Sequence, residues 1–172
     1  APSPSRARTP AVRELPVDRP CRGPYFAGVP RERLCHIELC VSDLARSVEF
    51  YRDLLGFREV SRLEISGKET DRLLGLEAVE LEAVYLERDG TRIELLHFPR
   101  PGETAGETPR PMNRPGLTHL SLRTEDLEAT LERLETAGIA ALRETYIERP
   151  EFEASAVFVS DPDGTRIELV QS

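Results

Sequence analysis

Apolar and chemically reactive side chains alternate along residues 34–41, which read Leu-Cys-His-Ile-Glu-Leu-Cys-Val. Successive side chains of a strand point to opposite faces, so this alternation predicts a strand over these residues. One face is expected to be apolar. The other is expected to carry His36, Glu38 and Cys40.

A helical pattern follows this strand directly. Ser42 and Asp43 supply side-chain oxygens of the kind that cap a helix N-terminus, and Gly56 is typical of the residue that ends one. Apolar side chains between them recur at helical spacing. This stripe predicts a helix that covers the apolar face of its sheet, and it consists of Leu44, Val48, Tyr51 and Leu55.

Three further strands are expected in the first half of the chain, and the second half repeats the whole order. Asp-Gly pairs at 89–90 and 163–164 predict hairpins between the last two strands of each half. The pattern therefore predicts an α+β fold of two tandem βαβββ modules. The expected strands are 57–65, 79–87 and 91–97, then 117–123, 140–147, 154–160 and 165–171. The second helix is expected to have Thr124 or Asp126 as its cap and Gly138 at its end. Its apolar stripe is expected to be Leu127, Leu131 and Leu134.

The repeat is also visible in the letters of the sequence. GTRIELL at 90–96 returns as GTRIELV at 164–170, and in each half a histidine stands seven positions before an aspartate. A duplicated module places its residues at equivalent positions. His36 therefore corresponds to His119, and Glu94 corresponds to Glu168.

The remaining organisation follows from proline content and charge. Residues 1–33 hold seven of the fourteen prolines and seven arginines against three acidic residues, which predicts an extended N-terminal arm. This arm is either a plain tail or a segment that docks by charge on its own acidic body or on a neighbouring subunit. The rest forms one domain, with module one at 34–98, a proline-rich and glycine-rich connection at 99–116 that is a linker or a lid, and module two at 117–172; residues 66–78 are a second segment expected at the rim of a site.

Composition excludes several classes of partner. The net charge of −8 argues against nucleic acid, because phosphate binding needs a basic surface. No apolar run approaches the length of a membrane span, and no secretion signal is visible. The three cysteines lack metal-binding or disulfide spacing, which indicates reduced thiols and a cytoplasmic protein.

The two histidines and two glutamates are a candidate metal site. Taken singly, a strand histidine is more often a hydrogen-bonded structural residue, and a strand glutamate more often faces solvent. Here the strand periodicity puts both histidines on one face of the first strands and both glutamates on one face of the last strands. Inward carboxylates need a partner, and one divalent transition metal (Zn, Ni, Co, Mn or Fe) would supply it.

The two halves resemble the vicinal oxygen chelate superfamily, which includes glyoxalase I, methylmalonyl-CoA epimerase, extradiol dioxygenases, fosfomycin-resistance transferases and bleomycin-binding proteins. The resemblance rests on HIELCVSDLARSVEFYRDLLGF, on HLSLRTEDLEATLERLETAGI and on FVSDPDGTRIELVQ, and it covers residues 34–171. It implies curled mixed sheets around a metal and a homodimer that binds a small molecule. The ligands that it implies are His36, Glu94, His119 and Glu168.

Within this superfamily the residues favour proton transfer. We expect an isomerase or epimerase that abstracts a proton next to a metal-chelated carbonyl of a small hydroxyketone (cyclitol or sugar-like) or acyl thioester through an enediolate, with Glu168 or Glu94 as the base. A glyoxalase-type lyase is the second hypothesis. An extradiol dioxygenase is disfavoured because Phe158 stands where its tyrosine would be and no histidine follows His119. A non-enzymatic antibiotic-binding protein is disfavoured because such proteins generally lack the ligands.

Other residues share the predicted inward face. Glu38, Ser121 and Arg123 are expected to bind substrate, with Glu38 also able to act as an added base. Cys40 is expected to be a small buried residue rather than a nucleophile. His97 has the opposite strand parity from Glu94 and is expected to point away from the metal.

Overall fold

The computed structural model describes residues 34–103 and 111–172. The predicted N-terminal arm and part of the connection between the modules lie outside the described residues. Within the described ranges, no helix is both long enough and apolar enough to cross a membrane.

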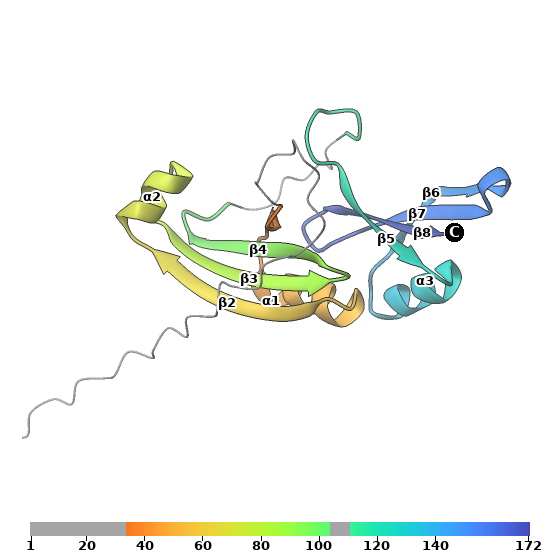
Figure 1. Ribbon diagram of the computed structural model, residues 1–172, viewed down its shortest axis with the longest axis horizontal. Helices are drawn as coiled ribbons and strands as arrows, with labels where there is room; N and C mark the ends of the chain where they lie inside the picture. Colours follow the sequence, from red (N-terminus) through yellow and green to blue (C-terminus); the bar gives the residue numbers. More distant parts are fainter. Residues whose placement is uncertain (1–33, 104–110) are drawn as a thin grey trace, which may run out of the picture. The chain divides into compact units, whose positions relative to one another are not determined.

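Each half of the described chain contains one four-stranded sheet and one main helix (Figure 1). The elements of module one are β1 (Ile37–Cys40), α1 (Leu44–Val48), the π-helix η1 (Glu49–Leu54), β2 (Arg58–Ser66), α2 (Lys68–Leu74), β3 (Glu80–Arg88) and β4 (Thr91–Arg100). Those of module two are β5 (His119–Thr124), α3 (Leu127–Thr136), β6 (Ala141–Arg149), the 3-10 helix η2 (Pro150–Phe152), β7 (Ala154–Ser160) and β8 (Arg166–Gln171).

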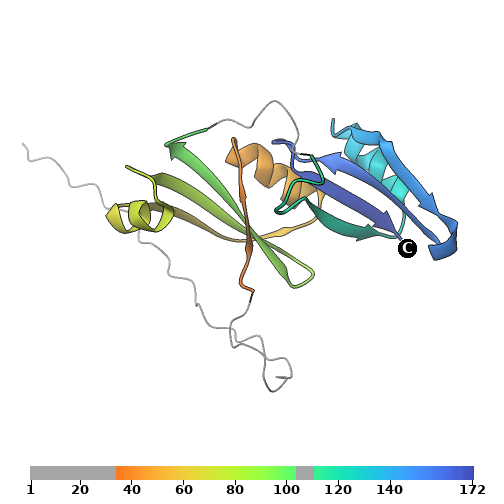
Figure 2. The ribbon, with the colours of Figure 1, turned by 90° about the horizontal axis from the view of Figure 1, so that it is seen from above.

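The two sheets have the same topology. Their strand orders are β1-β4-β3-β2 and β5-β8-β7-β6. In each sheet the first strand of the module pairs in parallel with the last one, and the other neighbours are antiparallel. The strands are curved and the sheets stay open (Figure 2). The predicted fold of two βαβββ modules with curled mixed sheets is confirmed.

Both predicted helices are present, and aspartates cap them. Asp43 Oδ1 accepts a hydrogen bond of 3.0 Å from the backbone N–H of Arg46, and Asp126 Oδ1 accepts one of 2.9 Å from that of Ala129. Ser42 does not act as a cap: its backbone N–H and its hydroxyl both donate to the Asp163 carboxylate. The first helix also widens into a π-helix after Val48, which its apolar stripe did not predict.

Two local features add detail to the expectations. Residues 68–74 form the short helix α2, none of whose side chains is buried. Both predicted hairpins are present: the one at Asp89-Gly90 is tight, with both residues at positive φ, and the one that joins β7 to β8 has the longer loop 161–165. The Asp161 carboxylate organises this loop, because it accepts hydrogen bonds from the backbone N–H groups of Asp163 at 3.0 Å and Thr165 at 2.7 Å.

One hydrophobic core serves both modules. The stripe of the first helix and the stripe of α3 belong to the same buried cluster as the helix-covered faces of strands from both sheets. Each helix stripe is shielded from water by its own sheet together with the other module. The two halves therefore stabilise each other. The strand residues of this cluster are Val84, Leu86, Ile93 and Leu95 in module one, and Val157, Val159, Ile167 and Leu169 in module two.

A buried hydrogen bond joins the modules within this core. The Tyr51 hydroxyl, on the first helix, donates to Asp161 Oδ2 of the β7–β8 loop at 2.8 Å. Burial raises the pKa of both side chains above their ordinary values. A carboxyl whose pKa is raised in the folded state costs stability as the pH rises through that pKa, and the Tyr51 hydroxyl offsets part of this cost.

We expect Tyr51→Phe to lower the free energy of unfolding by about 1–3 kcal/mol at neutral pH, because it removes a donor from a buried carboxylate. The loss should be smaller near pH 4 than near pH 7, since a protonated Asp161 depends less on the donor than the anion does. Urea denaturation of both proteins across this range measures the difference. A loss that is independent of pH would show that Asp161 is not the partner that matters.

Candidate metal centre

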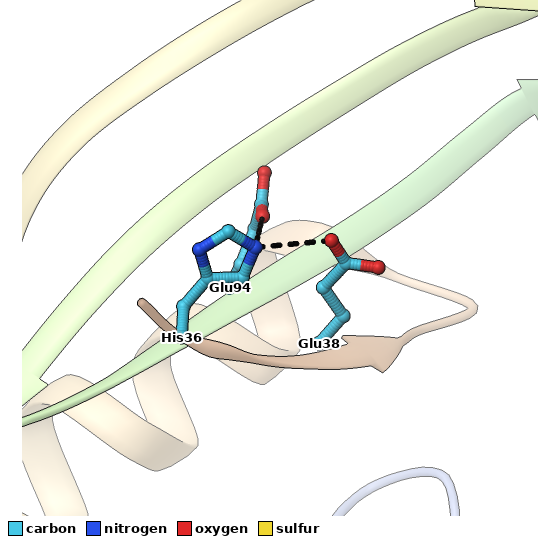
Figure 3. Close-up of side chains that lie close together, drawn as sticks. All are labelled: His36, Glu38 and Glu94. Atoms are coloured by element: carbon cyan, nitrogen blue, oxygen red, sulfur yellow. Dashed lines mark hydrogen bonds and ion pairs between the residues drawn. The ribbon is translucent and has the colours of Figure 1, made fainter. Parts of the chain in front are cut away.

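The first His–Glu pair lies where β1 meets β4 (Figure 3). His36 immediately precedes β1, and Glu38 is the register partner of Glu94 across the parallel pair. The three side chains point toward one another. His36 Nε2 lies 3.0 Å from Glu38 Oε1 and 3.0 Å from Glu94 Oε2.

The two carboxylates differ in their exposure. The side chain of Glu94 is 5% exposed, whereas that of Glu38 is 54% exposed. Burial raises the pKa of Glu94, while a hydrogen bond from Tyr85 and the proximity of His36 act in the opposite direction. Glu94 is therefore a carboxylate kept in a poorly hydrated position by a few specific partners.

Tyr85 is a site residue that the sequence analysis missed. It lies on β3 in register with Glu94, and its ring packs edge-on against the imidazole of His36 with the ring centroids 5.4 Å apart. Its hydroxyl donates a hydrogen bond to the Glu94 carboxylate. Burial and this hydrogen bond raise the pKa of the Tyr85 phenol. The repeat in the sequence did not reveal it: Phe158 holds the same register position opposite Glu168, but it stands ten residues before that glutamate, whereas Tyr85 stands nine before Glu94.

The second His–Glu pair lies in the other sheet, where β5 meets β8. His119 Nε2 is 3.6 Å from Glu168 Oε2. The Ser121 hydroxyl donates to the same Glu168 oxygen at 2.7 Å, and Ser121 and Glu168 are register partners. Phe158 packs edge-on against His119 with the centroids 5.3 Å apart, so module two repeats the arrangement of module one with different neighbours.

The structure brings the predicted ligands together in pairs. Within residues 34–103 and 111–172, the metal-binding type side chains whose ligand atoms gather within 4.8 Å in a group of three or more are His36, Glu38 and Glu94. His119 and Glu168 are not part of that group. The convergence of all four ligands on one ion stays a prediction.

Three further candidate residues lie on strands β1, β4 and β5, where the two His–Glu pairs are found. Arg123 lies on β5, exposed, two residues beyond Ser121 and so on the same face. His97 points away from the site, as expected, and its Nδ1 lies 3.2 Å from the Val41 carbonyl oxygen. The expectation of a buried Cys40 was wrong: the residue is exposed at the end of the edge strand β1.

The donor sets suit a divalent transition metal. Each pair offers an imidazole nitrogen and a carboxylate oxygen, which are donors that Mn(II), Fe(II), Co(II), Ni(II) and Zn(II) accept. In module one, Nε2 carries at most one hydrogen but has two carboxylate oxygens at 3.0 Å. A cation would satisfy this cluster better than a single N–H does.

Comparison with known proteins identifies the class to which this fold and these paired ligands belong. Residues 33–169 match the model of the Glyoxalase/Bleomycin resistance protein/Dioxygenase superfamily. The chain belongs to this superfamily, as its resemblance to the vicinal oxygen chelate proteins implied. The superfamily includes enzymes such as lactoylglutathione lyase, metal-binding proteins and some members that are not enzymes.

Several individual proteins are similar over most of their length. The chain is 33% identical to the protein YaeR of Escherichia coli (strain K12) over 79% of this chain and 93% of that protein. It is 30% identical to a probable lactoylglutathione lyase of Synechocystis sp., over 81% of this chain and 95% of the relative. A glyoxalase family protein from Bacillus cereus has the same fold, with a TM-score of 0.73, 21% identity, and coverage of 86% of this chain and 98% of that one.

We expect purified protein to carry about one divalent ion per His₂Glu₂ set, and His36→Ala combined with His119→Ala to lose it, because each pair would lose its nitrogen donor. Elemental analysis after dialysis measures the metal content. A circular dichroism spectrum like that of the unsubstituted protein is the control for folding. Full metal retention in the folded double variant would refute the ligand assignment.

Proposed function

We propose that the protein is a divalent-metal-dependent enzyme that moves a proton at the carbon next to a substrate carbonyl. Its metal ligands would be His36, Glu94, His119 and Glu168. The observation that carries this proposal is the duplicated pairing of a histidine with a glutamate at the junction of the first and last strands of each sheet. Membership of a superfamily that contains metal-dependent lyases supports it.

The chemistry divides between the ion and the side chains. A bound divalent cation would act as a Lewis acid on two neighbouring substrate oxygens and make the adjacent C–H more acidic. A carboxylate of the site then removes the proton and returns it to another face or carbon. Glu168 is favoured for this step over Glu94, because its side chain is 27% exposed whereas that of Glu94 is 5% exposed.

Substrate binding is assigned to polar residues on the same faces as the ligands. Glu38 and Ser121 stand beside the two ligand carboxylates, and Arg123 continues the row along β5. The Arg123 guanidinium suits a carboxylate or hydroxyl groups on the substrate. This set fits a small hydroxyketone, cyclitol or sugar-like, or an acyl thioester.

Epimerase and lyase activities use the same first step. The relative described as a probable lactoylglutathione lyase favours the lyase, which is the second candidate function. Lactoylglutathione is itself an acyl thioester with a hydroxyl next to its carbonyl, so it belongs to the substrate class proposed here. The two activities differ in which carbon the proton reaches.

We expect the metal-loaded protein to incorporate deuterium from D₂O at the carbon next to the carbonyl of its substrate. Candidate hydroxyketones and acyl thioesters, lactoylglutathione among them, are incubated in D₂O and followed by NMR. Glu168→Gln should slow exchange by about 100-fold or more, since a general base contributes this much. Oxygen consumption with a catechol at a rate matching turnover would instead identify a dioxygenase.

We further propose that the site is completed across a homodimer. Each chain presents His36 with Glu94 on one sheet and His119 with Glu168 on the other, and no group of three or more ligands among the described residues joins the pairs. In a two-fold dimer, module one of one copy can face module two of the other, which produces two equivalent sites.

This arrangement predicts complementation between two inactive variants. A His36→Ala chain and a His119→Ala chain, mixed under conditions that allow subunit exchange, would form heterodimers in which one site carries both substitutions and the other carries neither. About a quarter of all sites should then be intact after random exchange. Activity reports this. If mixing restores no activity, each site is built within a single chain.

A further inference from the structure

Among the differences between the two half-sites, one lies beside the ligand glutamate on the neighbouring strand. Two residues after the histidine, module one has Glu38 and module two has Ser121. Each is the register partner of the ligand glutamate on the neighbouring parallel strand, Glu94 and Glu168 respectively. The backbone therefore delivers both side chains to the same place, and only their chemistry differs.

In module one this position adds a third donor of the kind that metals bind. The ligand atoms of His36, Glu38 and Glu94 lie within 4.8 Å of one another. Glu38 Oε1 is as close to His36 Nε2, at 3.0 Å, as Glu94 Oε2 is. A single imidazole N–H shared between two oxygens bonds each of them more weakly than it would bond one, so the two adjacent carboxylates compete for it. A cation between the three atoms removes this competition.

In module two the same position does the opposite. The Ser121 hydroxyl donates a hydrogen bond of 2.7 Å to Glu168 Oε2, the oxygen nearest to His119. It thus occupies one lone pair of the ligand carboxylate and adds no charge. Module two therefore offers two ligand side chains, one of which has a competing partner.

We propose that Glu38 is a metal ligand, so that module one alone holds a divalent cation through His36, Glu38 and Glu94 while module two supplies the weaker and exchangeable pair. This rests on the proposed metal-dependent function. It adds to that function that the two modules contribute unequally to metal binding. Two carboxylates with one imidazole also shift the metal preference of the site toward ions that favour oxygen ligands, such as Mn(II).

The test uses Mn(II) alone, without substrate, on the full chain. Glu38→Ser gives module one the residue that module two carries, and the 54% exposure of the Glu38 side chain makes the fold tolerant of the change. Glu64→Ser is the matched control, because it removes the same charge by the same substitution. Glu64 is exposed on β2, the other edge strand of the same sheet. Free Mn(II) is measured by EPR titration.

We expect Glu38→Ser to weaken Mn(II) binding by about tenfold or more. Loss of a residue that only hydrogen-bonds to a metal ligand already lowers metal affinity by this much. Glu64→Ser should leave the affinity within about twofold, since an exposed charge on the opposite edge strand of the sheet is screened by salt. The Co(II) absorption spectrum should also change in Glu38→Ser and not in Glu64→Ser, because it responds to the number of donors.

The contrary outcomes are separable. If Glu38→Ser keeps the affinity and the Co(II) spectrum of the unsubstituted protein, Glu38 is not a ligand and the proposed function stands. If both substitutions weaken binding equally, the effect is general charge and the inference is wrong. If the unsubstituted protein binds neither Mn(II) nor Co(II), the metal-dependent function fails, and the inference fails with it.

Discussion

The parallel pairing of the first strand of each module with its last strand is the constraint on which the rest depends. It brings residues from the two ends of a module side by side, β1 against β4 and β5 against β8. Without this pairing, His36 and Glu94 would be separated by the helices and the strands β2 and β3 that lie between them in sequence. The parallel register also decides which neighbours the ligands have, because it sets Glu38 against Glu94 and Ser121 against Glu168.

Much of the fold could be predicted because local pattern and tertiary structure agree. The strand alternation, the aspartate caps and the apolar stripes all describe elements that bury one face, and each is found close to its expected bounds. The length of the β7–β8 loop was not predicted, because it depends on distant partners. The five-residue loop between β7 and β8 forms around the Asp161 carboxylate, which is in turn held by Tyr51 from the other module. The Asp-Gly pair alone does not distinguish a loop of this length from a tight turn.

The candidate site shows the same division. Repetition in the sequence identified the His–Glu pairs, and strand parity correctly turned His97 away from them. Parity also placed Glu38 on the right face, but it could not reveal that its carboxylate would reach the imidazole of His36. Tyr85 escaped notice because its contact with Glu94 requires the register between β3 and β4, which the hairpin sets and which composition does not encode.

The shared core has a consequence for how such a duplicated protein can diversify. Both helical stripes are enclosed in a single apolar cluster, so a change in either stripe affects the stability of both halves. The side chains that distinguish the two half-sites, Glu38 from Ser121 and Tyr85 from Phe158, lie outside that cluster. Evolution can therefore alter the chemistry of one copy while the other copy and the common interior stay unchanged. A symmetric scaffold can in this way acquire two unequal halves without passing through an unstable intermediate.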